Sequence, residues 1–221
     1  SKEFDEIFVW DAEGSSSIQF NATEISRNSL GAIVHNNIIL DAIFNELEKI
    51  PEIKLIEDAK LKEIIQDRNE IKLITESGHS ISSELLIGAD GSLSKTRDLS
   101  NIPIRTWSYE QLAIVTSVTT ENPLNRTAFQ IFTDTGPIAL LPLSTGKNQA
   151  SLIWSTDEPY GNKILELEND LLMKELRLKT ENKFGAISLN EEIKSFPLHQ
   201  LHAKSFYKSR IFFYSFRKRI S

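Results

Sequence analysis

Five residues between positions 88 and 97 have the types and the spacing of a ligand-binding turn. Gly88, Asp90, Gly91, Ser94 and Arg97 follow an apolar run and precede a short helical pattern. The two glycines let the backbone turn sharply and let a ligand come close. An ionised Asp90 offers two acceptor oxygens, which suit hydroxyl-rich groups such as ribose or a ribityl chain. The guanidinium of Arg97 offers a planar fork of donors that suits phosphate.

A purely structural interpretation of the same residues stays open at this point. Aspartate and serine commonly cap turns and helix starts, so Asp90 and Ser94 could serve only the local backbone. Arg97 would then be an ordinary surface charge.

The elements that position this turn are predicted from the apolar pattern of the chain. Helical spacing predicts helices over residues 36–50, where Pro51 ends the pattern, and over residues 163–179. Alternating or short apolar runs predict an antiparallel meander in the second half of the chain. The expected strands are 7–10, 17–20, 60–66, 70–75, 80–87, 112–119, 128–133, 138–143, 150–155 and 211–214.

Composition excludes several classes of function. The net charge of -6 argues against a general nucleic-acid binder, because such domains are usually basic. The absence of cysteine excludes disulfides, thiolate metal sites and a cysteine nucleophile, and it is compatible with the cytoplasm. No apolar run approaches the roughly 18–20 residues that span a bilayer.

The turn resembles a motif of a known family. Asp90-Gly91-x-x-Ser94-x-x-Arg97 resembles the "DG" motif of the aromatic-ring flavoprotein monooxygenases, which share the fold of para-hydroxybenzoate hydroxylase. Further segments resemble the ubiquinone-biosynthesis hydroxylases of this family, of the 2-polyprenyl-6-methoxyphenol hydroxylase type. These segments are residues 30–40, 109–115, 128–132, 136–143, 151–155 and 196–198.

This resemblance implies an FAD-dependent monooxygenase that hydroxylates a polyprenylated phenol, with NAD(P)H as co-substrate. Its expected location is the cytoplasm, peripheral to the inner membrane, in a complex with other ubiquinone-biosynthesis proteins. Two alternatives are another FAD-dependent oxidoreductase of the same fold, such as an isoprenoid reductase or a halogenase, and a degenerate fragment without enzymatic activity.

The resemblance also assigns residues to the cofactor. Asp90 and Gly91 are expected at the pyrophosphate and ribityl region of FAD, with Arg97 near the dinucleotides. Gly88 and Ser94 complete this cofactor-binding set. A further contact is expected from Asn37, where the N-terminal amides of the first helix face the flavin. A plain helix cap is the alternative for Asn37.

Four residues are assigned to the substrate by the same resemblance. Gly136, Pro137, Leu141 and Pro142 are expected on strands that face the flavin and the phenol ring. The alternative is an ordinary hairpin with a buried sheet face. No catalytic side chain and no metal ligand is assigned.

The expected organisation is mixed α/β, with a partial FAD-binding domain joined to an antiparallel-sheet substrate domain. Residues 31–100 form part of the FAD-binding domain, residues 1–30 and 101–204 form the substrate domain, and residues 205–221 form a final strand and a truncated or altered tail. The family also carries Gly-x-Gly-x-x-Gly and a later Gly-Asp motif for FAD, and neither occurs here. We therefore expect an incomplete and inactive chain that by itself binds FAD weakly or not at all.

Overall fold

The computed structural model describes residues 1–144 and 146–214, which divide into two compact units. The sheet unit consists of Ser1–Lys49 and Glu110–Leu198. The turn unit consists of Ile50–Tyr109 and the chain from His199 onward. The predicted division into an FAD-binding domain and a substrate domain follows other boundaries and stays a prediction. Of the final strand and tail predicted over residues 205–221, residues 215–221 lie outside the described residues.

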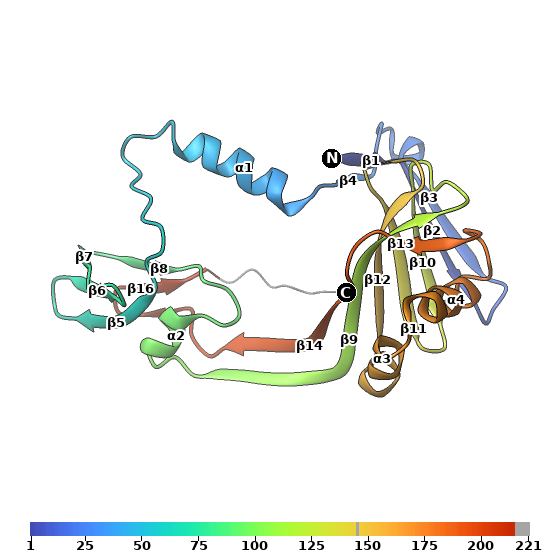
Figure 1. The fold of residues 1–221 in the computed structure, drawn as a ribbon. Coiled ribbons are helices and arrows are strands. Elements are labelled where there is room, and N and C mark those ends of the chain that lie inside the picture. The colour runs from blue at the N-terminus through green and yellow to red at the C-terminus, as the bar shows by residue number, and fades with distance from the viewer. Residues whose placement is uncertain (145, 215–221) are drawn as a thin grey trace. The chain divides into compact units, whose positions relative to one another are not determined.

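The sheet unit is built on a large β-sheet with the strand order β13-β9-β12-β11-β10-β2-β3, and β14 also pairs with β9 (Figure 1). The expected meander is present, since β10, β11, β12 and β9 are antiparallel neighbours. The pairing of β10 with β2 is parallel. The strands are β2 (Glu6–Asp11), β3 (Ser17–Asn21), β9 (Ile104–Thr120), β10 (Thr127–Thr133), β11 (Gly136–Pro142), β12 (Gln149–Asp157), β13 (Ile187–Leu189) and β14 (Lys194–Ala203).

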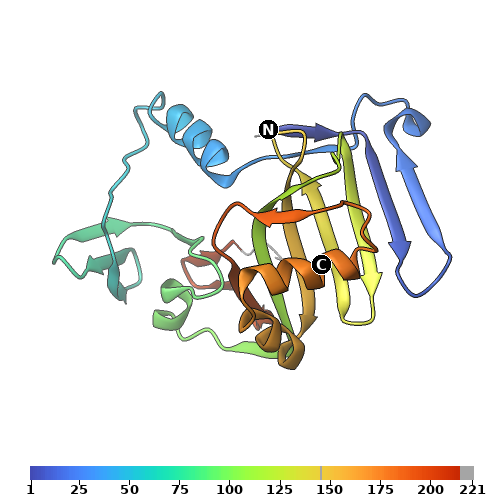
Figure 2. The same cartoon turned by 45° about the vertical axis from the view of Figure 1, so that its right-hand side comes forward.

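One face of this sheet is covered by two helices, α3 (Glu158–Leu165) and α4 (Asn169–Lys179), as Figure 2 shows. Side chains alternate between the faces of a strand, so every second residue enters the core beneath these helices. The core includes Trp10, Ile114, Ile131, Ile138, Leu140, Leu152 and Trp154 from the sheet and Leu172, Met173 and Leu176 from α4. The opposite face of the sheet is called the open face below.

The single helix predicted over residues 163–179 is wrong, because the chain forms α3 and α4 with a break at residues 166–168. The carboxylate of Asp157 caps α3 by accepting a hydrogen bond of 2.9 Å from the amide of Tyr160. Leu165 and Leu167 both pack against the core. Residues two apart do not share one face of a continuous helix, so the break lets both leucines reach the core.

The turn unit contains two small sheets. In one of them β5 (Leu61–Gln66), β6 (Ile71–Thr75) and β7 (Ser80–Ser83) pair in sequence order. In the other, β16 (Ile211–Phe213) lies between β15 (Tyr207–Lys208) and β8 (Leu86–Gly88), and its pairing with β8 is parallel. The predicted strand 80–87 is therefore two strands, since the chain changes partners between β7 and β8.

The remaining elements lie in the first 47 residues of the chain. β1 (Lys2–Phe4) pairs with β4 (Gly31–Ile33), and η1 (Ala22–Ile25) is a short 3-10 helix. The first predicted helix is α1 (Asn36–Leu47), which ends three residues before the expected Ile50 and buries none of its residues. Within residues 1–144 and 146–214, no helix combines the length and apolar character needed to cross a membrane.

Candidate functional site: the turn between β8 and α2

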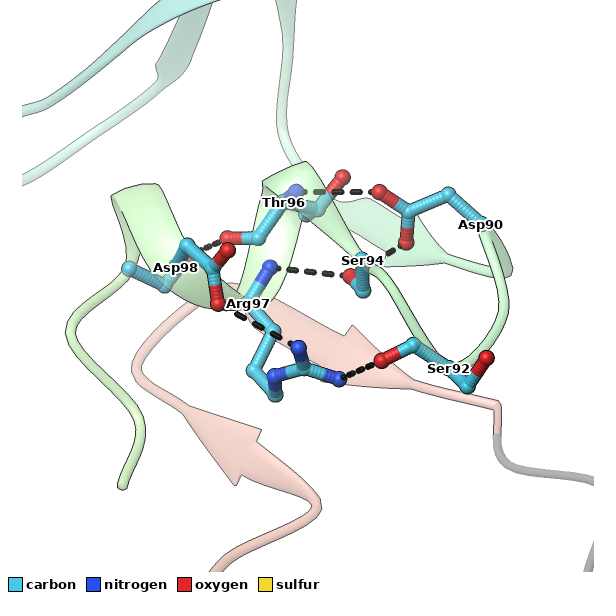
Figure 3. A network of polar contacts seen from close by, with 7 residues as sticks. Asp90, Ser92, Ser94, Thr96, Arg97 and Asp98 are labelled. Carbon is cyan, nitrogen blue, oxygen red and sulfur yellow. Dashed lines mark hydrogen bonds and ion pairs between the residues drawn. The ribbon is translucent and has the colours of Figure 1, made fainter. Parts of the chain in front are cut away.

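The predicted turn joins β8 to the short helix α2 (Lys95–Leu99) in the turn unit (Figure 3). The carboxylate of Asp90 accepts hydrogen bonds from the hydroxyl of Ser94 and, at 2.9 Å, from the amide of Thr96. Ser94 in turn caps α2, because its hydroxyl accepts a bond of 3.0 Å from the amide of Arg97. The structural interpretation of Asp90 and Ser94 as caps therefore holds.

This local role leaves Asp90 able to accept further bonds. A carboxylate has about four lone-pair positions on its two oxygens, and the turn uses each oxygen once. Asp90 itself is exposed. The arrangement is therefore compatible with an additional hydroxyl donor from a ligand, and the cofactor role of Asp90 stays a prediction.

Arg97 is buried, which differs from the surface charge considered in the structural interpretation. Its side chain is 8% exposed. One terminal nitrogen donates at 2.9 Å to the carbonyl of Ser92, and the other lies 3.3 Å from a carboxylate oxygen of Asp98 (Figure 3). Its Nε is buried and has no hydrogen-bond partner. Arg97 thus stabilises the turn as a buried side chain that bonds to its backbone. The expected contact of Arg97 with the dinucleotide stays a prediction.

The two glycines of the turn have different functions. Gly88 lies in β8, and a side chain there would meet the ring of Phe213 at 2.9 Å, so Gly88 allows close packing against β16. Gly91 has a φ of +80°, a left-handed conformation that favours glycine, and a Cβ at this position would meet no atom within 4 Å. The backbone at Gly91 therefore borders open space that a ligand could enter.

The electrostatics of the turn favour an ionised Asp90. Desolvation raises the pKa of this carboxyl, but hydrogen bonds from Ser94 and Thr96 outweigh that effect, so the pKa of Asp90 lies below its ordinary value of 3.8. Asp90 is therefore an anion near neutral pH and acts only as an acceptor.

The lowered pKa of Asp90 predicts a pH-dependent stability of the turn unit. Because the folded pKa is below the unfolded pKa, the stabilisation by this carboxylate is complete above the ordinary value and is lost as the pH falls through the folded value. We expect Asp90→Asn to flatten the loss of stability below about pH 4. Urea midpoints measured from about pH 3 to pH 6 test this, and identical pH profiles for both proteins would contradict it.

The other predicted cofactor residue, Asn37, lies at the second position of α1. Its side-chain oxygen accepts a bond of 3.0 Å from the amide of Ile38, the next residue. The N-cap residue is His35, which makes no side-chain capping bond. Asn37 belongs to the sheet unit, whereas the residues from Gly88 to Arg97 belong to the turn unit.

The four predicted substrate residues lie on or beside β11, but not on one face. Pro137 and Leu141 are partly exposed and lie on the open face of the sheet. Pro142 is buried, because it follows Leu141 directly and so points to the helix-covered face. Gly136 forms the turn into β11 with a φ of +111°. Only Pro137 and Leu141 are thus placed to face a ligand on the open side.

Gln130, a polar residue of the open face, lies in the predicted family segment 128–132 but was not among the predicted site residues. Gln130 on β10 pairs with Val9 on one side and with Ala139 of β11 on the other. No hydrogen bond of its side chain is found within residues 1–144 and 146–214. The period of two along β10 could have indicated this, since the flanking Phe129 and Ile131 belong to the core side.

The chain also matches the model of a known protein family. The family model described as "FAD binding domain" matches residues 29–214, which is most of the chain. This range includes the whole turn from Gly88 to Arg97 and the strands from β9 to β12.

Two curated relatives carry names from ubiquinone biosynthesis. The Caenorhabditis elegans "Ubiquinone biosynthesis monooxygenase COQ6, mitochondrial" is 32% identical over 183 residues, covering 80% of this chain and 39% of the relative. The Escherichia coli "3-demethoxyubiquinol 3-hydroxylase" is 29% identical over 195 residues, covering 88% of this chain and 49% of the relative. The chain therefore spans half or less of the length of these relatives.

A solved structure supports the fold. The PqsL protein of Pseudomonas aeruginosa superimposes with a TM-score of 0.79 at 14% sequence identity, covering 95% of this chain and 59% of that protein. The predicted mixed α/β fold with a partial FAD-binding domain is confirmed, as is the resemblance to the flavoprotein hydroxylases.

Proposed function

The chain belongs to the family of FAD binding domains, and we propose on this premise that it forms part of an FAD-dependent monooxygenase that hydroxylates a polyprenylated phenol in ubiquinone biosynthesis. The relatives named for this pathway support the reaction and the substrate class. NAD(P)H is the proposed co-substrate. Contact with a membrane surface and with other ubiquinone-biosynthesis proteins belongs to the same proposal.

The observation that carries the proposal is the turn around Asp90 and Gly91. The exposed, ionised Asp90 retains acceptor capacity, and the backbone of Gly91 borders open space. These residues fit a hydroxyl-rich group such as the ribityl or ribose part of FAD. Ser94 and the buried Arg97 would keep the turn in the conformation that presents both residues.

In such an enzyme the cofactor and the protein have different roles, which is consistent with a site that has no assigned pair of acid and base residues. Bound FAD supplies the electron transfer and the oxygen chemistry, while the protein binds, orients and shields. In this chain the turn unit would hold the cofactor, and the open face with Pro137 and Leu141 would orient the phenol.

The proposal is tested by comparing two proteins. One is the 221-residue chain, and the other is a longer protein that also contains any residues encoded by flanking sequence. The longer protein is expected to bind FAD and to couple NAD(P)H oxidation to hydroxylation of a prenylated phenol. Asp90→Ala in that protein should weaken FAD binding. A longer protein that binds FAD but never hydroxylates a phenol would contradict the proposed reaction.

For the 221-residue chain alone we expect weak FAD binding or none, because it lacks two of the family's three FAD motifs. Titration of FAD fluorescence against the purified chain measures this, with the far-UV spectrum as the control for folding. Tight binding with a perturbed visible spectrum would show instead that the turn around Asp90 suffices.

A further inference from the structure

Three aromatic rings on the helix-covered side of the large sheet surround one ammonium group. The Nζ atom of Lys183 lies 4.2 Å from the ring centroid of Phe8 and 4.6 Å from that of Trp10. The ring centroid of Phe129 is 5.7 Å from the same atom. We call these three rings the aromatic cage. Each distance is within the roughly 6 Å at which the face of an aromatic ring attracts a cation.

The pairing of β2 with β10 builds the aromatic cage. Phe8 and Trp10 are two residues apart on β2, so their side chains point to the same face of the sheet. Phe129 of β10 is paired with Phe8 and therefore lies on that face too. The ring centroids are 5.5–6.3 Å apart at interplanar angles of 46–86°. The rings are thus tilted toward one another rather than stacked, which lets them surround a shared cation.

The loop that carries Lys183 is fixed through its backbone. The carbonyl of Lys183 accepts a bond of 2.9 Å from the side-chain amide of Asn122, and its amide donates at 3.0 Å to the carbonyl of Thr180. The preceding residues Glu181 and Asn182 have left-handed φ values of 53° and 57°. Such conformations are costly outside glycine and persist where the surrounding structure holds them. The fold therefore keeps the base of the Lys183 side chain beside the cage.

The rings are the contacts that hold the Lys183 ammonium. In the part of the chain that the structure describes, its Nζ atom makes no hydrogen bond and no ion pair, although acidic residues outnumber basic ones by 31 to 25. Lysine carries its charge on a flexible four-carbon stem. A side chain of this kind, held by no directional bond, can leave the rings and be replaced by another cation.

We propose that Phe8, Trp10 and Phe129 form a binding site for alkylammonium ions, with the side chain of Lys183 as its internal ligand. An external alkylammonium ion competes with Lys183 for the same rings. An occupant on the same chain acts at an effective concentration in the millimolar range or above, so the external ion binds weakly until this occupant is removed. The inference goes beyond the proposed reaction, because the cage lies on the sheet face opposite to the open face.

The test measures the binding of tetramethylammonium to the 221-residue chain by proton NMR. The methyl resonance of this ion should shift upfield on binding, because the ring current shields protons above a ring face. Lys183→Ala empties the cage. Lys174→Ala is the matched control, since Lys174 is an exposed lysine on α4 that lies outside the cage. tert-Butanol is the neutral control ligand, and far-UV spectra report the folding of each variant.

The expected result is that Lys183→Ala binds tetramethylammonium about tenfold more tightly than the wild type and Lys174→Ala do. Adding Phe8→Leu to Lys183→Ala should weaken this binding by roughly threefold to tenfold, because one ring face is lost while an apolar side chain remains. tert-Butanol should bind all these proteins equally weakly. Equal tetramethylammonium affinities of Lys183→Ala and Lys174→Ala, or equal binding of the two ligands by Lys183→Ala, would overturn the inference.

A second comparison leaves a long side chain over the rings and does not depend on the folding of Lys183→Ala. Lys183→Arg retains a cation, whereas Lys183→Met retains a stem of similar length without the charge. Urea denaturation followed by tryptophan fluorescence should give a midpoint near that of the wild type for Lys183→Arg and a lower one for Lys183→Met. Equal midpoints for these two variants would also overturn the inference, since the contact with the rings would then not depend on charge.

Discussion

Replacing Gly136 by alanine is expected to lower the free energy of unfolding of the sheet unit by about 3–6 kcal/mol. Gly136 has a φ of +111°, and a Cβ there would lie 2.2 Å from the carbonyl oxygen of Ser155. That oxygen belongs to the backbone of β12, where Ser155 is paired with Ala113 of β9. The clash therefore cannot be relieved by rotating a side chain.

Urea denaturation followed by tryptophan fluorescence measures this effect, since Trp10 and Trp154 are buried in the sheet unit. Gly146→Ala is the matched control. A Cβ at Gly146 would make only ordinary contacts, the nearest at 3.5 Å from the side chain of Gln149, and no left-handed φ is involved. Equal unfolding midpoints for the two variants would show that the turn into β11 is not constrained as described.

The second large effect is expected at Arg97. We expect Arg97→Ala to destabilise the turn unit by about 2–4 kcal/mol, because it removes a buried, charge-assisted bond to the carbonyl of Ser92 and leaves a cavity. The amides of Arg97 and Ser100 should then exchange hydrogen faster, since they belong to the capped helix α2.

Hydrogen exchange across residues 88–100 and thermal unfolding measure this prediction. Arg126→Ala is the control, because Arg126 is exposed and pairs at the surface with Asp5 and Glu3. Surface ion pairs contribute little to stability, so this variant should unfold nearly as the wild type does. If both arginine variants behaved alike, Arg97 would not hold the turn. Its fork of donors would then be available to a ligand, as the resemblance implies.

The positions of the turn and most strands could be predicted because their causes are local. Asp90, Ser94 and Thr96 lie within six residues of one another, and the bonds among them depend only on the backbone between them. The period of two along β10, β11 and β12 likewise follows from the pleat of each strand. The single helix expected over residues 163–179 failed because the core, through Leu165 and Leu167, requires two helices.

The amino-acid sequence by itself thus determined the turn, the alternation of the strands and the resemblance to a flavoprotein family, since each is encoded by neighbouring residues. The tertiary structure alone decided that Arg97 is buried and which face of β11 is covered, so that Pro142 is buried while Leu141 is partly exposed. It also decided that β10 lies parallel to β2. The pairing of β2 with β10 depends on residues more than a hundred positions apart, such as Val9 and Gln130. A local pattern specifies the shape of a strand but not its partner or the face that is covered.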